Sequence, residues 1–348
     1  MRPVYVRGCA VVRTWADASR NLTEFIYQGV AKALADAECT ASDVDGVVLG
    51  AHDVVDGRGL TSMVTAPGAA AYLKDEVRLS EDGATAMVVG VARVRAGTNN
   101  VCVVAAWGRA SEGQPDAISH ALFNPFFARP LGLTELSVSA MRAAAALRHF
   151  PDYREWRDQV AYQRAHIGGP PQRRPARAIP LNVDDLPTWA DVVAAVVLTA
   201  EPGPVEVRGV GMSTEPYEIG DRDLLGFPAL TRASATALDM AGTTIADIGI
   251  FELDGLTTFD DALAVEAVGA APPGQGMRFL AQSNSVNQDG GSAAGYCAPA
   301  MGLLRVAHAS LALRWGPHEL ALATGSSVVA AQTQASIVLR RTGNEVFL

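Results

Sequence analysis

A glycine-rich segment near the end of the chain carries residues suited to oxyanion and proton chemistry. Residues 286–302 read VNQDGGSAAGYCAPAMG, a pattern in which a buried strand ends, the backbone turns through glycines and a helix begins. Such a turn brings backbone N–H groups close to a ligand and directs the amino end of a helix at it. Within it, the phenol of Tyr296 can donate a hydrogen bond to an oxyanion or shuttle a proton. The segment is therefore the first candidate for a functional site.

The same segment resembles a signature of the thiolase family. In that family N-x-x-G-G is followed by G-H-P-x-G-A-x-G, and the His helps to hold the thioester oxygen. Gly295, Ala300 and Gly302 fill matching places here, whereas Tyr296 replaces the His. The chain thus resembles a thiolase whose site has been altered.

Three further segments extend this resemblance over the whole chain. LSEDGATAM at 79–87 resembles the nucleophile elbow, with Ser80 at the position of the Cys. ELDGLTTFDDALAVEAVG at 252–269 resembles the H-D-C-F-T segment of the sterol-carrier-protein thiolases. ALATGSSVVA at 321–330 resembles the last active-site loop.

The catalytic residues of an ordinary thiolase are replaced in these segments. Leu253 stands in place of a His and Gly255 in place of a Cys, although Asp254 between them matches. The last loop has Gly325 and two serines where ordinary thiolases carry a second Cys. Both Cys positions and both His positions are therefore altered, and the thiolase mechanism cannot be carried over.

The exchange of His for Tyr resembles the thiolase-like aldolases that shorten steroid side chains. This resemblance implies retro-aldol cleavage of a β-hydroxyacyl-CoA, which needs a base for the β-hydroxyl proton and a donor for the thioester enolate, but no nucleophilic Cys. Tyr296 is then expected to act as the base or proton shuttle. Backbone N–H groups around Gly290, Gly291 and Gly325 are the expected donors to the enolate.

Other polar residues have a catalytic and a structural interpretation. Asp254, Asp289 or Glu81 would tune the phenol or hold a water, while Asp254 equally suits the N-cap of the following helix. Asn287 would bind an active-site water or only stabilise the turn. Tyr296 itself would fill the space of the lost His in a non-catalytic protein.

Apolar runs alternate with helical patterns in the first part of the chain. Residues 4–12 and 44–50 are predicted as strands, and 22–37 as a helix with one apolar face. Residues 82–97 are predicted as a buried helix with a glycine stop, followed by a buried strand at 100–108. This alternation predicts an α/β fold with largely covered sheets.

The second half of the chain repeats the first. Residues 33–49 align without a gap with 237–253, and 302–325 echo the segment that begins at Gly90. An internal repeat implies two similar halves. It agrees with the thiolase fold that the resemblance implies, in which two αβ halves are stacked as five layers with the site between them.

The resemblance also divides the chain into parts. Residues 1–112 with 186–202 form the N-terminal half, and 203–348 form the C-terminal half. Between them, 113–185 form a shortened loop domain that covers the site. This loop domain contains a basic cluster that consists of Arg173, Arg174 and Arg177. The cluster would either bind CoA phosphates or lie on a solvated loop.

Composition excludes several classes of protein. The chain has 348 residues and a net charge of −9, which argues against nucleic acid as the main partner. No apolar run reaches the roughly 18 residues that span a membrane, and the first residues lack the core of a signal peptide, so a cytoplasmic location is expected. Cysteines and histidines lack metal-ligand spacing, so neither a metal nor a disulfide set is expected.

Three functions follow as hypotheses. The first is a lyase acting on a bulky β-hydroxyacyl-CoA, such as a steroid-derived one, with no covalently bound cofactor. The second is a non-catalytic subunit that binds acyl-CoA or lipid or supports a thiolase-type complex, and the third is a condensing or acyl-transfer enzyme that uses Ser80. Resemblance implies a small partner with an OB fold and often a zinc ribbon. It also implies a homodimer, for which the run VCVVAA at 101–106 would be either an interface element or a central buried strand.

Overall fold

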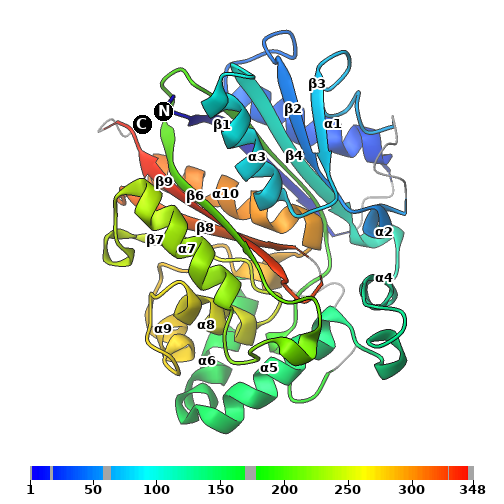
Figure 1. Ribbon diagram of the computed structural model, residues 1–348, viewed down its shortest axis with the longest axis vertical. Helices are drawn as coiled ribbons and strands as arrows, with labels where there is room; N and C mark the ends of the chain where they lie inside the picture. The colour runs from blue at the N-terminus through cyan, green and yellow to red at the C-terminus, as the bar shows by residue number, and fades with distance from the viewer. Residues whose placement is uncertain (1, 16–18, 58–63, 169–177, 328, 344–348) are drawn as a thin grey trace.

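The structure is a computed structural model that describes residues 2–15, 19–57, 64–168, 178–327 and 329–343. Within these residues the strands form one mixed sheet in the order β3-β2-β4-β5-β1-β6-β9-β8-β7 (Figure 1). The strands are β1 (Tyr5–Thr14), β2 (Gly46–Gly50), β3 (Asp75–Leu79), β4 (Val101–Arg109), β5 (Asp191–Thr199), β6 (Val205–Thr214), β7 (Ile250–Glu252), β8 (Leu320–Ser327) and β9 (Thr333–Arg341). The α-helices are α1 (Leu22–Asp36), α2 (Asp53–Asp56), α3 (Gly83–Ala96), α4 (Pro115–Leu122), α5 (Glu135–His149), α6 (Pro151–Gly168), α7 (Pro228–Ala241), α8 (Thr258–Ala267), α9 (Gly276–Gln282) and α10 (Ala298–Trp315).

The sheet consists of two parts that meet at β1 and β6. Strand β1 pairs along its length with β5, but it pairs with β6 only where Tyr5 faces Glu206 and Val6 faces Val205. Strands β1–β5 therefore form the sheet of the first half, and β6–β9 form that of the second.

Helices cover both faces of each half. Helix α1 packs on β1 and β5, and α7 packs on β6 and β9. Helices α3 and α10 lie between the halves, where α10 contacts both β5 and β8 (Figure 1). Residues 303–307 of α10 are all buried, as expected for a helix covered on all sides. The predicted fold of two αβ halves in five layers is confirmed.

The internal repeat corresponds to repeated elements. Helix α1 and strand β2 of the first half correspond to α7 and β7 of the second, and α3 and β4 correspond to α10 and β8. The first residues of β2 and β7 are Gly46 and Ile250. They are as far apart along the chain as the first residues of the aligned segments 33–49 and 237–253. The repeat in the sequence therefore reports a repeat of structure.

Local sequence signals explain where the site-bearing helices begin. Asp82 is the N-cap of α3, and Gly97 ends that helix in a left-handed conformation (φ 77°), which confirms the predicted glycine stop. Thr257 is the N-cap of α8 and forms a capping box with Asp260.

Between β4 and β5 the chain forms α4, α5 and α6, of which α4 contacts α2 and α5, whereas α5 and α6 pack against the second half. Helix α5 contacts α8, and α6 contacts α9. Tyr153 of α6 is fully buried and donates a hydrogen bond to Glu266 Oε1 (2.8 Å), whereas Tyr162 is 69% exposed. Tyr153 is therefore part of the local core.

Strand β4 lies between β2 and β5, so the run VCVVAA is a central buried strand and not an interface element.

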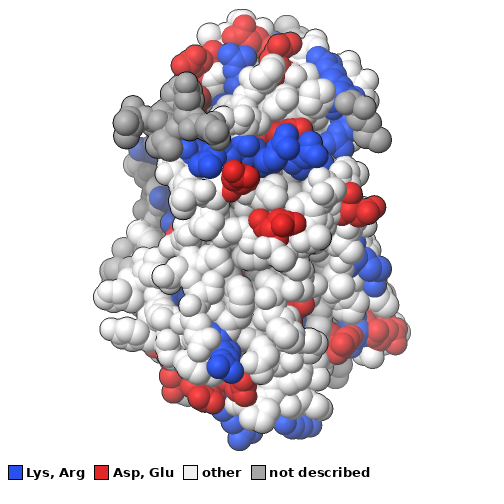
Figure 2. All heavy atoms as spheres, turned by 90° about the vertical axis from the view of Figure 1, so that its left-hand side faces the viewer, with Lys and Arg blue, Asp and Glu red and all other residues white. Residues whose placement is uncertain are grey.

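Figure 2 shows a band of basic side chains across the upper part of one face, with acidic side chains above and below it. The net negative charge is thus unevenly distributed. In the described part of the chain, no helix combines the length and the apolar character needed to cross a membrane.

Candidate functional site

The ends of several elements converge between the two halves. Strands β7 and β8 are parallel neighbours, so Asp254, which follows β7, lies beside Ser326 at the end of β8. The backbone N–H of Asp82 at the start of α3 donates to Ser327 Oγ (3.0 Å). These contacts bring residues of both halves together beside the amino end of α10.

Tyr296 lies at this junction, just before α10. Its backbone N–H donates to Thr188 O (2.8 Å), and its carbonyl accepts from Ala190 N (3.2 Å). Its ring centroid lies 5.9 Å from that of Trp189, and the residue is 8% exposed. The segment that leads into β5 therefore fixes Tyr296 in place.

Two cavities border Tyr296. The larger, about 60 Å³, has mainly apolar walls that include Ile118, Leu122 and Trp189. The smaller, about 30 Å³, is lined by polar groups such as Asp254 and by the serines at the end of β8. Three residues line both cavities, namely Glu135, Leu256 and Tyr296.

The surroundings of Tyr296 keep its phenol protonated. Burial raises its pKa well above the ordinary value, and the negative charges of Asp254, Glu135 and Asp82 raise it further. Tyr296 is therefore suited to donate a hydrogen bond or a proton near neutral pH. A resting phenolate, which the expectation of a Tyr296 base requires, is disfavoured.

Asp254 anchors the end of β8. Its Oδ2 accepts from Ser326 N (2.9 Å) and Ser326 Oγ (2.8 Å), and its backbone N–H donates to Thr324 Oγ1 (3.0 Å). Burial raises the pKa of this carboxyl, while the two donors of Ser326 oppose the effect. Because Thr257 caps α8, the interpretation of Asp254 as the cap of that helix is wrong.

Asp82 is a buried carboxyl that the sequence patterns did not indicate. Its Oδ1 accepts from Ala84 N (2.7 Å), and its Oδ2 accepts from Gly302 N (3.0 Å). Burial and the nearby charge of Asp254 raise its pKa, while the backbone donors oppose the effect. Asp82 thus occupies the amino ends of both central helices.

Glu135 was also absent from the sequence-based candidates. It is the first residue of α5, and its Oε1 and Oε2 accept from Ala330 N at 2.7 and 2.8 Å. Burial raises the pKa of this carboxyl to about 7. In sequence it is an ordinary acidic residue after a helix cap, so only the packing of α5 brings it to Tyr296.

The glycine turn uses its N–H groups internally. Gly290 N donates to Asn287 O (2.9 Å), and Gly291 N donates to Asp289 Oδ1 (3.0 Å). In this conformation both N–H groups already have acceptors within the turn, so the expected role of Gly290 and Gly291 as enolate donors stays a prediction that would require these bonds to break. The Asn287 side chain accepts from Leu253 N (2.7 Å) and donates to Leu253 O (3.0 Å), so it stabilises the turn.

Gly325 and Gly255 are required by close packing. An added Cβ at Gly325 would lie 2.4 Å from both Ala84 Cβ and Asp82 Oδ1. At Gly255, where the resemblance expects a Cys, it would lie 2.0 Å from Asp261 Oδ1. A carboxylate thus fills the space that a Cys side chain would need. Leu253, in place of the His, is fully buried in the core.

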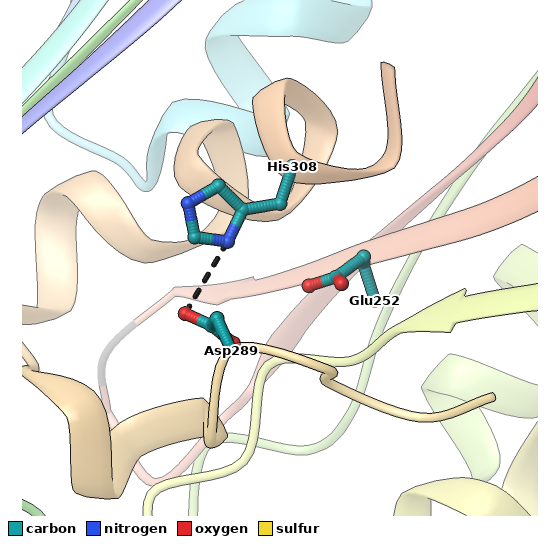
Figure 3. A group of neighbouring side chains, drawn as sticks. All are labelled: Glu252, Asp289 and His308. Carbon is teal, nitrogen blue, oxygen red and sulfur yellow. Dashed lines mark ion pairs between the residues drawn. The ribbon is translucent and has the colours of Figure 1, made fainter. Parts of the chain in front are cut away.

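Asp289 belongs to an ionic cluster beside α10. It contacts Arg305 (2.9 Å), His308 (3.3 Å) and Arg13 (3.3 Å), and Arg305 also contacts Glu252 (3.0 Å). Figure 3 shows His308 directed at Asp289 with Glu252 beside them. The pKa of Asp289 is lowered well below its ordinary value, because the surrounding cations outweigh its burial.

The group Glu252, Asp289 and His308 offers three ligand atoms within 4.8 Å of one another, a spacing that suits a metal ion. The buried guanidinium of Arg305 already binds both carboxylates. The donors therefore fit an ion-pair network better than a divalent metal site. Asp289 lines neither cavity beside Tyr296.

The candidates from the nucleophile elbow do not line the cavities beside Tyr296. Ser80 is exposed. Glu81 lies near His52. Burial lowers the pKa of His52, and the negative charges of Asp53 and Glu81 oppose this effect.

Burial raises the pKa of the Cys297 thiol, which lines the larger cavity and stays protonated. The CoA-binding candidates Arg173, Arg174 and Arg177 lie outside the described residues.

A larger cavity of about 440 Å³ lies far from this junction. Its walls include Arg7, Arg314 and Arg341 at the opposite end of α10 from Tyr296. At ~1.5 Å per residue, the helix separates the two places by ~27 Å. The size of this cavity therefore says nothing about the chemistry at Tyr296.

Comparisons with known proteins agree with this architecture. Residues 211–338 match the family described as thiolase C-terminal domain-like. The solved structure of the Ltp2-ChsH2(DUF35) aldolase is similar to this chain with a TM-score of 0.79 and 18% identity, over 98% of both chains. Human mitochondrial 3-ketoacyl-CoA thiolase is similar with a TM-score of 0.70 and 13% identity, over 98% of this chain and 99% of that one.

One curated relative is the benzoylsuccinyl-CoA thiolase subunit BbsB of Thauera aromatica. It is 27% identical over 118 residues, which are 32% of this chain and 31% of that subunit. The match therefore spans about a third of the relative's length. Taken together, the chain has the fold of the thiolases. More particularly, residues 211–338 of its second half match the thiolase C-terminal domain-like family.

Proposed function

We propose that this protein cleaves a β-hydroxyacyl-CoA thioester by a retro-aldol reaction, giving a ketone and a shortened acyl-CoA. The observation that carries the proposal is Tyr296, a buried phenol that remains protonated at the junction of the two halves and borders two cavities. A protonated phenol suits stabilisation of a thioester enolate. The likeness in fold to an aldolase supports this reaction class.

The alternatives to a lyase at this place lack a nucleophile. Cys297 is buried and its thiol pKa is raised, so little thiolate forms near neutral pH. Ser80 is exposed and lines neither cavity beside Tyr296. A retro-aldol reaction requires no covalent acyl-enzyme, which agrees with these two observations.

The polar cavity holds further donors for the thioester oxygen. Ser326 is fixed by Asp254, and Ser327 Oγ accepts from Asp82 N while retaining its own hydroxyl proton to donate. Tyr296 and Ser327 would together stabilise the negative oxygen of the enolate. Asp254 would hold the end of β8 in the required position.

The substrate needs more room than the cavities provide. Volumes of about 60 and 30 Å³ are far below the roughly 300–1,000 Å³ of typical ligand sites. This region would therefore open when a bulky acyl chain, such as a steroid-derived one, binds. A small OB-fold partner with a zinc ribbon would help to form the channel, and the likeness in fold to the Ltp2-ChsH2(DUF35) aldolase supports such a pairing.

The test uses the full chain, alone and with any co-purified partner, and 1-hydroxycyclohexylacetyl-CoA as the probe. The expected products are cyclohexanone and acetyl-CoA. Tyr296→Phe should reduce kcat by about 10²- to 10⁴-fold, because it removes the proton donor. Tyr27→Phe is the matched control, since Tyr27 is exposed on α1. Full turnover by Tyr296→Phe contradicts the assigned role.

One observation favours a non-catalytic subunit as a second candidate. The Tyr296 ring packs against Trp189 beside small cavities, as expected if the phenol only fills the space of a lost His. Such a protein would bind acyl-CoA tightly without converting it, with or without a partner. Calorimetric binding of the same thioester, with no ketone released, would support this candidate over the lyase.

A further inference from the structure

The retro-aldol reaction needs a base, and Tyr296 is not suited to that role. The proton of the β-hydroxyl group must leave as the carbon–carbon bond breaks. Tyr296 is held in its protonated form by burial and by neighbouring carboxylates. The base must therefore be another group that reaches the reacting atoms.

Glu135 has the required position. Glu135 and Tyr296 are the two ionisable residues that line both cavities, and Leu256 is the third residue shared by the two walls. The carbon–carbon bond to be broken joins the apolar part of the substrate to its polar thioester. A substrate bound across the two cavities would place that bond beside Glu135 and Tyr296.

Three other carboxyl groups nearby are less well placed. Asp82 lines neither cavity, and its two oxygens accept from Ala84 N and Gly302 N. Asp254 and Asp260 line only the smaller cavity. The Oδ2 of Asp254 accepts from Ser326, while its Oδ1 has no partner among the described residues, and the Oδ2 of Asp260 accepts from Ser139 Oγ and Thr257 N. Glu135 also accepts a backbone N–H, but it alone of the four reaches the apolar cavity where the β-carbon would lie.

We propose that Glu135 is the general base that takes the β-hydroxyl proton, and that Tyr296 is the acid that protonates the α-carbon of the thioester enolate. This inference rests on the proposed retro-aldol function. In the step, the oxygen–hydrogen bond of the substrate breaks and its proton goes to Glu135. The oxygen forms the ketone, the Cα–Cβ bond breaks, and its electron pair passes into the thioester enolate.

The second step completes the proton balance. The enolate carbon takes the phenolic proton of Tyr296, which yields the shortened acyl-CoA. The proton held by Glu135 then returns to the Tyr296 oxygen, directly or through one water. Both side chains regain their starting states, and the reaction consumes no oxidant or other reagent.

The charges around Glu135 suit a base near neutral pH. The pKa of Glu135 is raised to about 7, mainly because the carboxyl is buried. The N–H of Ala330 and the charges of Arg142 and Arg222 oppose this rise, and the charge of Asp260 adds to it. Two further ionisable residues, Tyr296 and Arg109, line the larger cavity together with Glu135. The carboxyl therefore changes its charge in the range where a general base works best.

The test follows kcat against pH from about 5.5 to 9, with 1-hydroxycyclohexylacetyl-CoA and the full chain. In the wild type, kcat should rise with pH through about 7 as Glu135 loses its proton. Glu135→Gln should lower kcat by about 10²- to 10⁴-fold and remove this rise. Its amide oxygen can still accept from Ala330 N, so folding should be preserved. Glu155→Gln, on the exposed side of α6, is the matched control.

A second variant covers the case in which Glu135→Gln does not fold. Glu135→Asp keeps the carboxyl but withdraws it by one methylene, so it should retain the rise with pH at a lower kcat. Wild-type kcat and pH profile in a folded Glu135→Gln protein overturn the role of Glu135 and leave the proposed function intact. Absence of cyclohexanone from the wild type, with and without its partner, overturns the proposed function and the base with it.

Discussion

The Asp82 carboxylate accepts a hydrogen bond from the backbone N–H of Gly302 at 3.0 Å, and this contact joins the start of α3 to α10. The other carboxylate oxygen caps α3 through Ala84 N. A Cβ added at Gly302 would lie 2.0 Å from Asp82 Oδ1 and 2.8 Å from Gly325 Cα. The junction of the two halves therefore requires a residue without a side chain at this position.

Gly302→Ala should destabilise the protein by about 1–3 kcal/mol or more, because the new methyl group must displace a carboxylate and nearby backbone. Urea denaturation would measure the free energy of unfolding. Gly220→Ala is the matched control, since no atom lies within 4 Å of a Cβ added there. Equal stability of the two variants would show that the junction is more open than the structure indicates.

The fold was predictable from the sequence because its signals are local or repeated. Alternating patterns located strands and helices, and the match of 33–49 with 237–253 indicated two similar halves. The position of Tyr296 followed from the same logic, since it lies in a glycine-rich turn before a helix. The capping box of Thr257 and Asp260 was also readable, and would have corrected the interpretation of Asp254.

The chemistry of the site was less predictable because it depends on packing between distant segments. The N–H groups of Gly290 and Gly291 are used by Asn287 and Asp289, which no spacing rule reveals. Glu135 reaches Tyr296 only because α5 packs over the second half. An isolated glutamate on a helix carries no motif that would distinguish it from a solvent-exposed one.

Asn287→Ala should lower the free energy of unfolding by at least about 2 kcal/mol. The substitution leaves the buried N–H and C=O groups of Leu253 without their side-chain partners, and each such loss is worth roughly 1–3 kcal/mol. Asn287 also has φ of +45°, a conformation that alanine adopts less readily. Gln288→Ala, at the exposed neighbouring position, should be nearly neutral in the same denaturation experiment. A similar small effect for both would contradict the turn-stabilising role.

Arg305→Met should destabilise the protein by about 3–5 kcal/mol near pH 7, because it leaves the buried Glu252 and the half-buried Asp289 without a shared cation. Burial raises the pKa of Glu252, and the charge of Arg305 opposes this rise. Without Arg305 the Glu252 carboxyl should therefore bind a proton in the folded variant as pH falls from about 7.5 to about 4.5, which removes the uncompensated charge. The difference between variant and wild type should shrink over this range.

The control for Arg305→Met is the double variant Arg305→Met/Glu252→Gln. It removes one of the two uncompensated charges and should recover part of the lost stability at pH 7. Urea denaturation of the wild type and both variants at pH 4.5 and 7.5 would measure these effects. A deficit that does not change with pH, or no recovery in the double variant, would argue that Arg305 acts through packing and not through charge.

Ser80→Ala should keep kcat for thioester cleavage within about twofold of the wild type, whereas Tyr296→Phe should lose most of it. Ser80 is exposed and lines neither cavity beside Tyr296, so its hydroxyl is not placed to attack a thioester bound there. A serine nucleophile also needs an adjacent base, and the nearby Glu81 lies with His52 and not at the cavities. Intact-mass measurement during turnover should accordingly show no acyl adduct. An adduct on Ser80, together with loss of activity in Ser80→Ala, would replace the lyase by an acyl-transfer enzyme, because the covalent intermediate would then be the species that carries the acyl group.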